Sequence, residues 1–428
     1  MPRAGSWSRR ARSSASKESS IRRRSTITGI AAVAGALAFL TGLTLLLAIP
    51  AVDDDDPAER LFELNLVLSS AIVYAALGGF LVVQAASALG GASSSPMRFG
   101  WQWFLLPVFP VMVAAGQALA SNPEHLPWVF PFVNVAMVSV PSLVIAALVA
   151  ARYHRAHPLA WPMSWREWTT GFIYGAIGAT TIAAIINTGY LGAMGTFLVH
   201  RYGEGSGSDL QDSIQSLPKG WGIFLDVTTL SVVAPLNEEF WKGSLVALFF
   251  FRRGGPARCF AWGVLAGTGF NLLETFTNSL AAVSPETLAN QQIGNAWWLF
   301  ACARGGTAVM HGLASGLSAL GIYGLLRHQP RYLLGYVGGV LLHGTWNFLV
   351  YVIYGDAFLS LQGPNSEALD ILGSAGLVLV FAAALAMLWL LPAELRDPAP
   401  APIYRMLGMV PARAEVPVPQ ADRTSAGV

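Results

Sequence analysis

The stretch from Trp221 to Phe251 reads WGIFLDVTTLSVVAPLNEEFWKGSLVALFFF, an apolar run interrupted by a polar cluster. It is longer than the roughly 20 residues that an α-helix needs to cross a bilayer core. Glu238, Glu239 and Lys242 lie near its middle, where charge is costly unless it faces protein or water. Lys242 follows the two glutamates by four and three residues, so it can pair with either. The stretch predicts a membrane helix that carries a polar site.

Outside this stretch, the composition is that of an integral membrane protein. The chain has 428 residues, of which 54% are hydrophobic and only 12% are charged. Apolar spans long enough to cross a bilayer cover residues 27–49, 65–90, 100–121, 127–151, 169–198, 221–251, 259–283, 296–326, 332–354 and 368–391. The first span is too long for a secretory signal. The sequence predicts an all-α, polytopic membrane helix bundle of about ten transmembrane helices.

The distribution of basic residues predicts the orientation. Of the 26 Lys and Arg residues, 21 fall on the side of both termini, and only Arg60, Arg201 and Lys219 fall on the other. The positive-inside rule therefore places both termini in the cytoplasm. The basic tail of residues 1–26 and the Pro-rich tail of residues 393–428 are expected to be disordered. We expect the lipid bilayer to be a partner of this protein, and we expect no nucleic-acid partner.

Ionisable residues divide the chain into two predicted units. The spans within residues 27–200 carry essentially none in their middles, and we expect them to be accessory transmembrane helices one to five. The spans within residues 201–392 carry nearly all of them and form the predicted catalytic unit, helices six to ten. No internal repeat is evident, which argues against a transporter built from duplicated halves.

The polar residues of helices six to nine lie at similar depths. The set comprises Glu238, Glu239 and Lys242 on helix six, Glu274 on helix seven, Arg304 and His311 on helix eight, and His343 and Asn347 on helix nine. The distance along each helix axis is counted from the short turns near residues 255 and 329 to Glu238, Glu274, His311 and His343. At ~1.5 Å per residue, these distances are about 21–28 Å. One layer of this kind predicts a polar cavity within the membrane. Pro235, just before the glutamate pair, predicts a local opening of its helix.

The chemistry of this set suits peptide hydrolysis. One of two adjacent carboxylates beside a cation can deprotonate water, while imidazoles and an amide stabilise an oxyanion. The sequence contains no HExxH zinc motif, and Asp226 has no intramembrane aspartate partner. Ser315 is expected to be a small residue for close helix packing. The two cysteines exclude a cysteine-rich metal site.

Alternatives from other classes stay open on these residues alone. Any single Glu–Lys or Glu–Arg pair is best explained as a structural ion pair, whereas the complete set favours function. The same cluster also suits an ion- or proton-coupled transporter. A non-catalytic membrane adaptor is a third alternative.

The order of the motifs resembles that of the PrsW family of intramembrane proteases, which is related to the CAAX-processing and bacteriocin-processing membrane proteases. The resemblance rests on Glu238-Glu239-x-x-Lys242, Phe270-x-x-x-Glu274, Arg304 through His311-Gly312, and His343-x-x-x-Asn347. It covers about residues 220–355. CAAX-type relatives usually carry Arg one position after Lys242 and His in place of Glu274, so prenylated substrates are not expected.

The resemblance implies a glutamic-type intramembrane endopeptidase in the bacterial cytoplasmic membrane. Its substrates would be membrane proteins, such as membrane-anchored regulators of the anti-sigma-factor kind. The implied roles are Glu238 as leading base, Glu239 as its partner or alternate, His311, His343 and Asn347 as ligands of the carbonyl or a metal, Glu274 as their orienting group, and Lys242 as the group that tunes the carboxylates. Arg304 can equally be structural. Zinc is an open possibility, but without HExxH we expect metal-free catalysis.

Overall fold

The computed structural model describes residues 28–49, 52, 56–97, 102–157, 162–203, 210–250, 254–284, 296–358 and 367–395. The basic tail and nearly all of the Pro-rich tail predicted from the sequence lie outside these residues. Within the described ranges the regular structure is helical, with a single isolated antiparallel bridge between Pro96 and Ser164. The predicted all-α fold is confirmed.

The helices follow one another with short connections. The first part contains a helix over Thr28–Leu46, then α2 (Pro57–Leu64), η2 (Asn65–Ser69), α3 (Ser70–Leu89), η3 (Gln102–Phe104), α4 (Leu105–Ala120), η4 (Pro127–Val129), α5 (Phe130–Ala156), α6 (Trp165–Ile173), η5 (Tyr174–Ala179) and α7 (Thr180–Tyr202). The second part contains α8 (Leu210–Gln215), α9 (Lys219–Val227), η6 (Thr228–Val233), α10 (Ala234–Leu245), η7 (Val246–Phe250), α11 (Pro256–Ala282), α13 (Ala296–Leu326), η9 (Pro330–Tyr332), α14 (Leu333–Phe358) and α15 (Glu367–Glu394).

Seven helices among the described residues are long and apolar enough to cross a membrane. They are Thr28–Leu46, Pro57–Leu89, Pro127–Ala156, Trp165–Tyr202, Trp297–Leu326, Pro330–Ile353 and Glu367–Glu394. The other three expected spans are also helical: α4 is shorter, with 16 residues, while residues 219–250 and α11 carry the polar groups of interest. The protein is therefore a multi-pass membrane protein. The total of about ten spans and the side of each terminus stay predictions.

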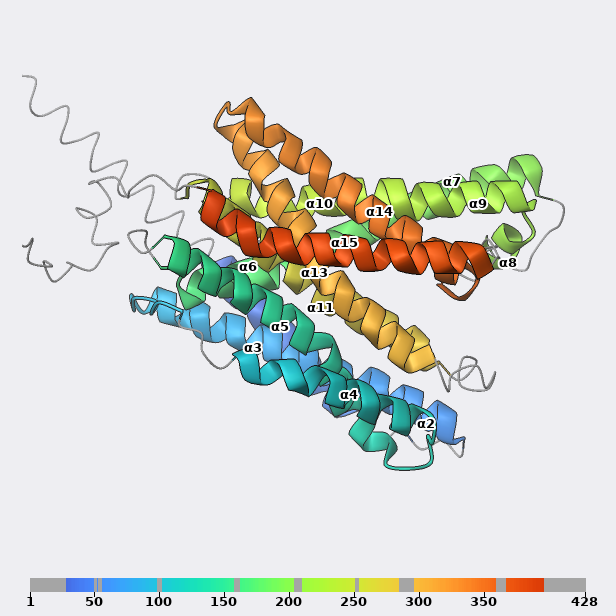
Figure 1. Ribbon diagram of the computed structural model, residues 1–428. Coiled ribbons are helices and arrows are strands. Elements are labelled where there is room, and N and C mark those ends of the chain that lie inside the picture. The colour runs from blue at the N-terminus through green and yellow to red at the C-terminus, as the bar shows by residue number, and fades with distance from the viewer. Residues whose placement is uncertain are drawn as a thin grey trace, which may run out of the picture.

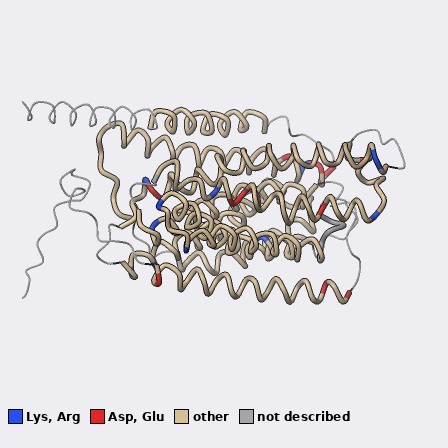
Figure 2. Tube along the Cα trace, turned by 90° about the horizontal axis from the view of Figure 1, so that it is seen from above, with Lys and Arg blue, Asp and Glu red and all other residues tan. Residues whose placement is uncertain are grey.

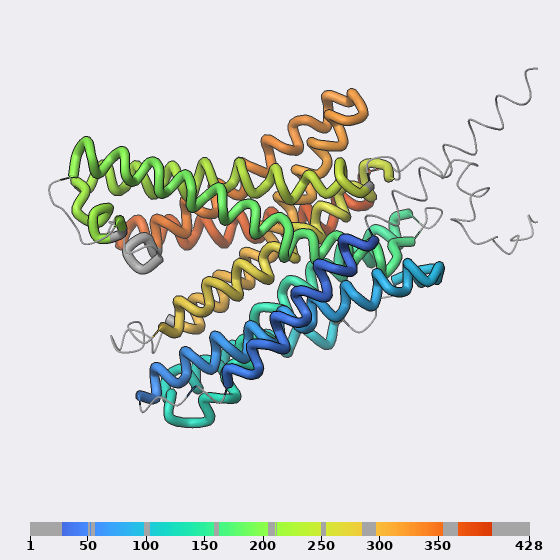
Figure 3. Tube along the Cα trace, turned by 180° about the vertical axis from the view of Figure 1, so that it is seen from behind, coloured from blue at the N-terminus to red at the C-terminus, as the bar shows by residue number. Residues whose placement is uncertain are grey.

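Two groups of helices flank a central pair. Helices α3, α4 and α5 lie on one side, α7, α9, α10 and α14 on the other, and α11 and α13 run between them (Figure 1). The view from behind shows the same separation of the blue and teal first part from the later helices (Figure 3). Helix α11 is buried along almost its whole length and packs most extensively against α13. The centre of the bundle is thus formed by two helices that both carry site residues.

Two glycines of α11 allow this close packing. A Cβ on Gly267 would lie 2.2 Å from the His311 carbonyl oxygen of α13, and a Cβ on Gly269 would lie 1.9 Å from the Phe172 carbonyl oxygen of α6. Contacts as short as these exclude any larger residue without movement of the backbone. Helix α11 therefore lies directly against the backbones of both neighbours, which brings its Glu274 next to His311.

The helix that holds the glutamate pair widens just before it. Thr228–Val233 is π-helical and runs directly into α10, where Pro235 lacks a backbone donor. A wide turn frees carbonyl groups that an α-helix would use internally. The side-chain amide of Asn347 donates to one of them, the Leu230 oxygen, at 2.9 Å. The local opening of the helix that was expected next to Pro235 is therefore observed. Asn347 of α14 hydrogen-bonds to one of the carbonyl oxygens in this wide turn.

Candidate active site

The charged residues of four helices meet in the interior of the bundle. Seen from above, acidic and basic positions occur midway along helices whose other residues are almost all uncharged (Figure 2). Glu239 and Lys242 of α10 are fully buried, and Glu238, His311 and His343 are nearly so. The structure thus brings together residues from α10, α11, α13 and α14, as the depth estimate from the sequence predicted.

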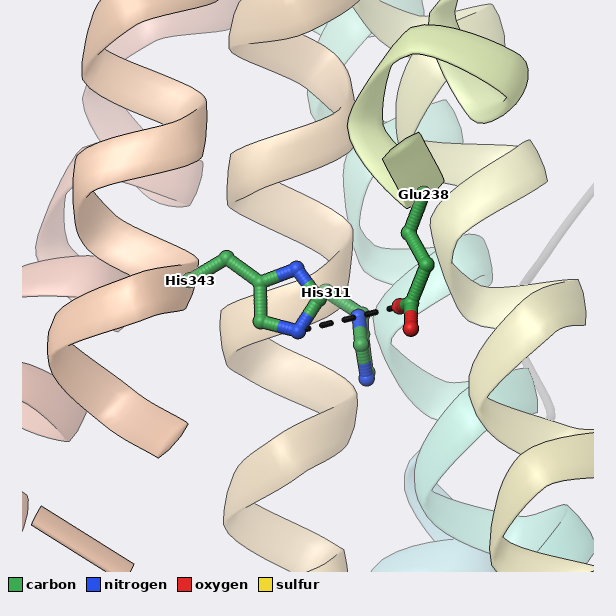
Figure 4. A group of neighbouring side chains, drawn as sticks. All are labelled: Glu238, His311 and His343. Atoms are coloured by element: carbon green, nitrogen blue, oxygen red, sulfur yellow. Dashed lines mark ion pairs between the residues drawn. The ribbon is translucent and has the colours of Figure 1, made fainter. Parts of the chain in front are cut away.

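At the centre of this group stand one carboxylate and two imidazoles. Glu238, His311 and His343 point toward one another from α10, α13 and α14 (Figure 4). One potential ligand atom from each lies within 4.8 Å of the other two. The His343 Nε2 atom is 3.8 Å from Glu238 Oε2. The oxygen and nitrogen atoms converge on one point, and the two rings meet edge to face with centroids 4.6 Å apart.

Each imidazole has one nitrogen that faces the centre. Its other nitrogen hydrogen-bonds with a carboxylate other than Glu238. His311 Nε2 hydrogen-bonds with Glu274 Oε2 at 2.9 Å, and His343 Nδ1 with Glu239 Oε1 at 3.0 Å. Such bonds fix the tautomer and the orientation of a ring. They leave His311 Nδ1 and His343 Nε2 as the atoms that face the centre.

Lys242 supplies positive charge beside these groups. Its ammonium pairs with Glu239, lies 3.6 Å from Glu238 Oε2 and donates to His311 Nδ1 at 3.0 Å. It also lies over the Phe270 ring, 4.2 Å from the centroid. Lys242 was predicted to be within reach of either glutamate, and in the structure it contacts both.

Glu274 is the most accessible carboxylate of the group. Its side chain is 29% exposed, compared with 9% for Glu238 and 0% for Glu239. Arg304 donates to Glu274 Oε2 at 2.7 Å and to the Thr275 hydroxyl at 3.0 Å. Arg304 thus fixes Glu274, which in turn fixes His311. The centre is closed on most sides and is most open at Glu274.

Asn347 and Ser315 have different surroundings from those expected. Asn347 lies one turn from His343, and its amide donates to the Leu230 oxygen of η6, away from the two histidines. Ser315 was expected only to allow close packing. It does lie at a close approach, since a Cβ on Gly267 would be 2.7 Å from its hydroxyl, but it also donates to Glu239 Oε2 at 3.0 Å.

A contact to the glutamate pair that sequence reasoning missed comes from α7. The Asn187 amide donates to Glu238 Oε1 at 3.1 Å, and its own oxygen accepts from Asn237 at 2.9 Å. Asn187 belongs to a span assigned to the accessory unit because only ionisable residues were considered there. An amide within an otherwise apolar membrane span was the available signal. The division near residue 205 stays a prediction, but α7 contacts the site.

Fold and site together define a class: a multi-pass membrane protein with carboxylates, imidazoles and an ammonium in contact in its buried interior. A family model described as PrsW family intramembrane metalloprotease matches residues 162–387, more than half of the chain. The chain belongs to this family, and the resemblance seen in its motifs is confirmed. The match also favours a protease over the transporter alternative. No match was found among curated proteins or among solved structures.

The family description implies a metal ion, and the residues present fit one. Two imidazole nitrogens and a carboxylate oxygen form a three-ligand set of the kind that catalytic zinc sites use. Glu238 Oε2 is buried and, among the described residues, has no hydrogen-bond partner. Each histidine has the carboxylate partner typical of metal-bound imidazoles. A divalent cation would meet suitable donors here once the Lys242 ammonium, which donates to His311 Nδ1, moved away from that nitrogen. The family description does not support the expectation of metal-free catalysis.

Proposed function

We propose that this protein is an intramembrane endopeptidase whose centre is formed by Glu238, His311 and His343. The convergence of one carboxylate and two imidazoles at a single buried point carries this proposal. Charged and polar groups at membrane depth are rarely retained without function. Membership of the PrsW family supplies the reaction type, hydrolysis of a peptide bond.

The same three residues are proposed to hold a divalent metal ion, with zinc the first candidate. When bound, such an ion polarises a carbonyl and makes water more acidic. Glu274 and Glu239 would orient the two histidine ligands from behind. Lys242 would balance the negative charge of the glutamate pair, which otherwise stands uncompensated in a medium of low dielectric constant.

The protein groups themselves also handle substrate and protons. The ammonium of Lys242 faces the same point as Glu238 Oε2, so it can stabilise an oxyanion formed from the scissile carbonyl. Glu274 is the carboxylate best placed to meet an incoming peptide, because it is the most exposed of the group. Asn347 lies on α14 one turn from His343, but its amide donates to the Leu230 oxygen. We therefore assign it no direct contact with the substrate.

The proposed substrates are membrane-anchored proteins, in particular regulators of the anti-sigma-factor kind in a bacterial cytoplasmic membrane. A centre buried among membrane-spanning helices supports a substrate that reaches it from within or beside the bilayer. Comparison of membrane proteomes from cells with the wild-type protein and cells with Glu238→Ala would identify fragments that disappear in the variant.

The decisive test uses purified protein in proteoliposomes with such a substrate. We expect Glu238→Gln to reduce cleavage by about a thousandfold, because the electrostatic role of the carboxylate is lost while its shape is kept. Glu63→Gln on α2, remote in the fold from α10, is the matched control and should cleave normally. Elemental analysis should find about one equivalent of metal in the wild type and much less in His343→Ala.

Two results would contradict the proposal. Undiminished cleavage by Glu238→Gln would remove Glu238 from the centre. Ion flux that depends on Glu238 and His343, without cleavage of any membrane protein, would instead support the transporter. If metal-free protein cleaves at the full rate, the protease assignment stands and the metal assignment fails.

A further inference from the structure

Asp226 of α9 is a buried acidic residue that the proposed chemistry does not use. It is fully buried, and its polar neighbour is the Tyr351 phenol of α14. Neither carboxylate oxygen makes a hydrogen bond of normal geometry with any described residue. Its polar neighbour among the described residues is a phenol and not a cation, and burying an acidic side chain with so few partners inside a membrane bundle is costly, so its presence requires an explanation.

Asp226 lies at one end of a continuous line of polar groups. Helix α14 runs antiparallel to α9, η6 and α10, and the contacts follow in order along the pair. Asp226 faces Tyr351, the Leu230 oxygen accepts from Asn347, the Ser231 backbone meets Gly344, and Glu238 faces His343. We call Asp226, Ser231, Glu238, His343, Asn347 and Tyr351 the polar seam.

The seam leads from the site toward the membrane boundary where α9 begins. Asp226 is 12 residues before Glu238, or about 18 Å along the helix, and 7 residues after Lys219, or about 10 Å from its start. In Figure 1 the α9 end of this helix lies beside α7 and α8, at the periphery of the bundle. The seam thus covers the distance between a boundary and the buried centre.

Several oxygen atoms along this helix make no hydrogen bond of normal geometry with the described residues. Besides Asp226, they are the hydroxyl groups of Thr229 and Ser231 and the Oε2 atom of Glu238, all of them buried. Buried polar atoms that protein groups do not satisfy are normally satisfied by ordered water. Four such positions lie on this one helix. The wide turn of η6 adds carbonyl oxygens that water can also bond.

We propose that the polar seam is a hydrated path that delivers water to the active site, with Asp226 as its outer anchor. The proposal rests on the proposed hydrolytic function, since each bond cleaved consumes one water molecule: its hydroxyl goes to the carbonyl carbon and its proton to the departing amine. Glu238 and both histidines are almost fully buried, and Glu274 is the most exposed carboxylate of the group. A buried hydrolytic centre in lipid needs such a supply.

The first experiment measures water along the seam without relying on proteolysis. In full-length protein reconstituted in liposomes, Cys259 and Cys302 are replaced by Ala and a cysteine is introduced at Ser231. We expect a water-soluble methanethiosulfonate to modify Ser231→Cys, because thiolate forms only where water is present. Val232→Cys is the matched control, since Val232 is the next residue in η6 and is 47% exposed toward the outside of the bundle.

The second experiment removes the anchor. Asp226→Leu should slow modification of Ser231→Cys and lower kcat of cleavage by about tenfold each, with KM unchanged, because an apolar side chain cannot hold water. Asp226→Asn should restore most of both rates, since an amide also binds water. Val232→Leu is the control variant for activity.

The outcomes separate the path from the protease. Equal reactivity of Ser231→Cys and Val232→Cys would overturn the hydrated path, and so would an Asp226→Leu protein with unchanged rates. If Asp226→Asn lost as much activity as Asp226→Leu, the charge of Asp226 and not its binding of water would matter, and the proposal would fail. A hydrated seam in a protein that cleaves nothing would leave the path intact and refute the proposed function.

Discussion

The helices predicted to be accessory and those predicted to be catalytic both bury polar side chains, but of different kinds. In the first group, the Asn134 amide donates to Asn65 at 3.0 Å and to Ser279 of α11 at 2.9 Å, and Ser69 donates to Asn65 at 2.8 Å. These groups are neutral. In the second group, carboxylates, imidazoles and an ammonium contact one another in the interior of the bundle.

The difference teaches what each kind of polarity does in lipid. Neutral amides and hydroxyls join helices at modest cost, because one or two hydrogen bonds satisfy them. Charged groups need a whole network of partners and are retained where chemistry uses them. The two regions meet at α11, whose Asn271 donates to Ser142 of α5 at 3.0 Å. Helix α5 thus contacts α11, which carries Glu274, through a neutral hydrogen bond.

The largest difference between the two regions is expected at His343, a proposed ligand of the centre. His343→Ala should reduce cleavage at least about a hundredfold, because the ring is lost from the converging set. Asn134→Ala, which removes an equally buried polar side chain from the neutral network, should stay within about twofold of the wild type. Rates of substrate cleavage in proteoliposomes measure both. Equal losses in the two variants would break the proposed contrast between the regions.

The next effect concerns the carboxylate behind His311. Glu274→Gln should lower cleavage about 10- to 100-fold and weaken metal binding, because the neutral amide holds the ring less firmly. Titration of metal-free protein with zinc gives the affinity. Glu59→Gln on α2 serves as the control. If zinc affinity were unchanged in Glu274→Gln, the residue would act on substrate and not through His311.

A smaller effect is expected for the contact from α7. Asn187→Ala should lower kcat about tenfold with little change in KM, because Glu238 loses the hydrogen bond that orients it. Asn187→Gln, which keeps the amide donor, should recover part of the loss. Thr188→Ala changes the neighbouring exposed side chain and should be silent. A loss confined to KM would assign Asn187 to substrate binding.

The smallest effect concerns the neutral network alone. Asn134→Leu should destabilise the folded protein by about 0.6–2 kcal/mol, since two interhelical hydrogen bonds disappear while the volume is kept. Thermal unfolding in detergent should show a midpoint lower by a few degrees, and cleavage at low temperature should be normal. Loss of cleavage at unchanged stability would mean that the accessory helices act on catalysis directly.

Much of this protein follows from the order of its residues. Apolar runs of sufficient length predict membrane helices, because the bilayer leaves backbone groups no other way to be satisfied. Counting residues from short turns places Glu238, Glu274, His311 and His343 in one layer, since the rise per residue of a helix is constant. The common layer of these residues was therefore predictable from the chain alone, and the structure brings them into contact.

Contacts between helices were decided only by the tertiary structure. Rotation of each helix about its axis determines which nitrogen of His343 meets Glu239 and directs Asn347 to the Leu230 oxygen. That rotation depends on packing across the whole bundle, such as the approach of α11 to α13 at Gly267. The role of Asn187 and the line of unsatisfied oxygens from Asp226 to Glu238 emerge only there, because they join segments that no local pattern relates.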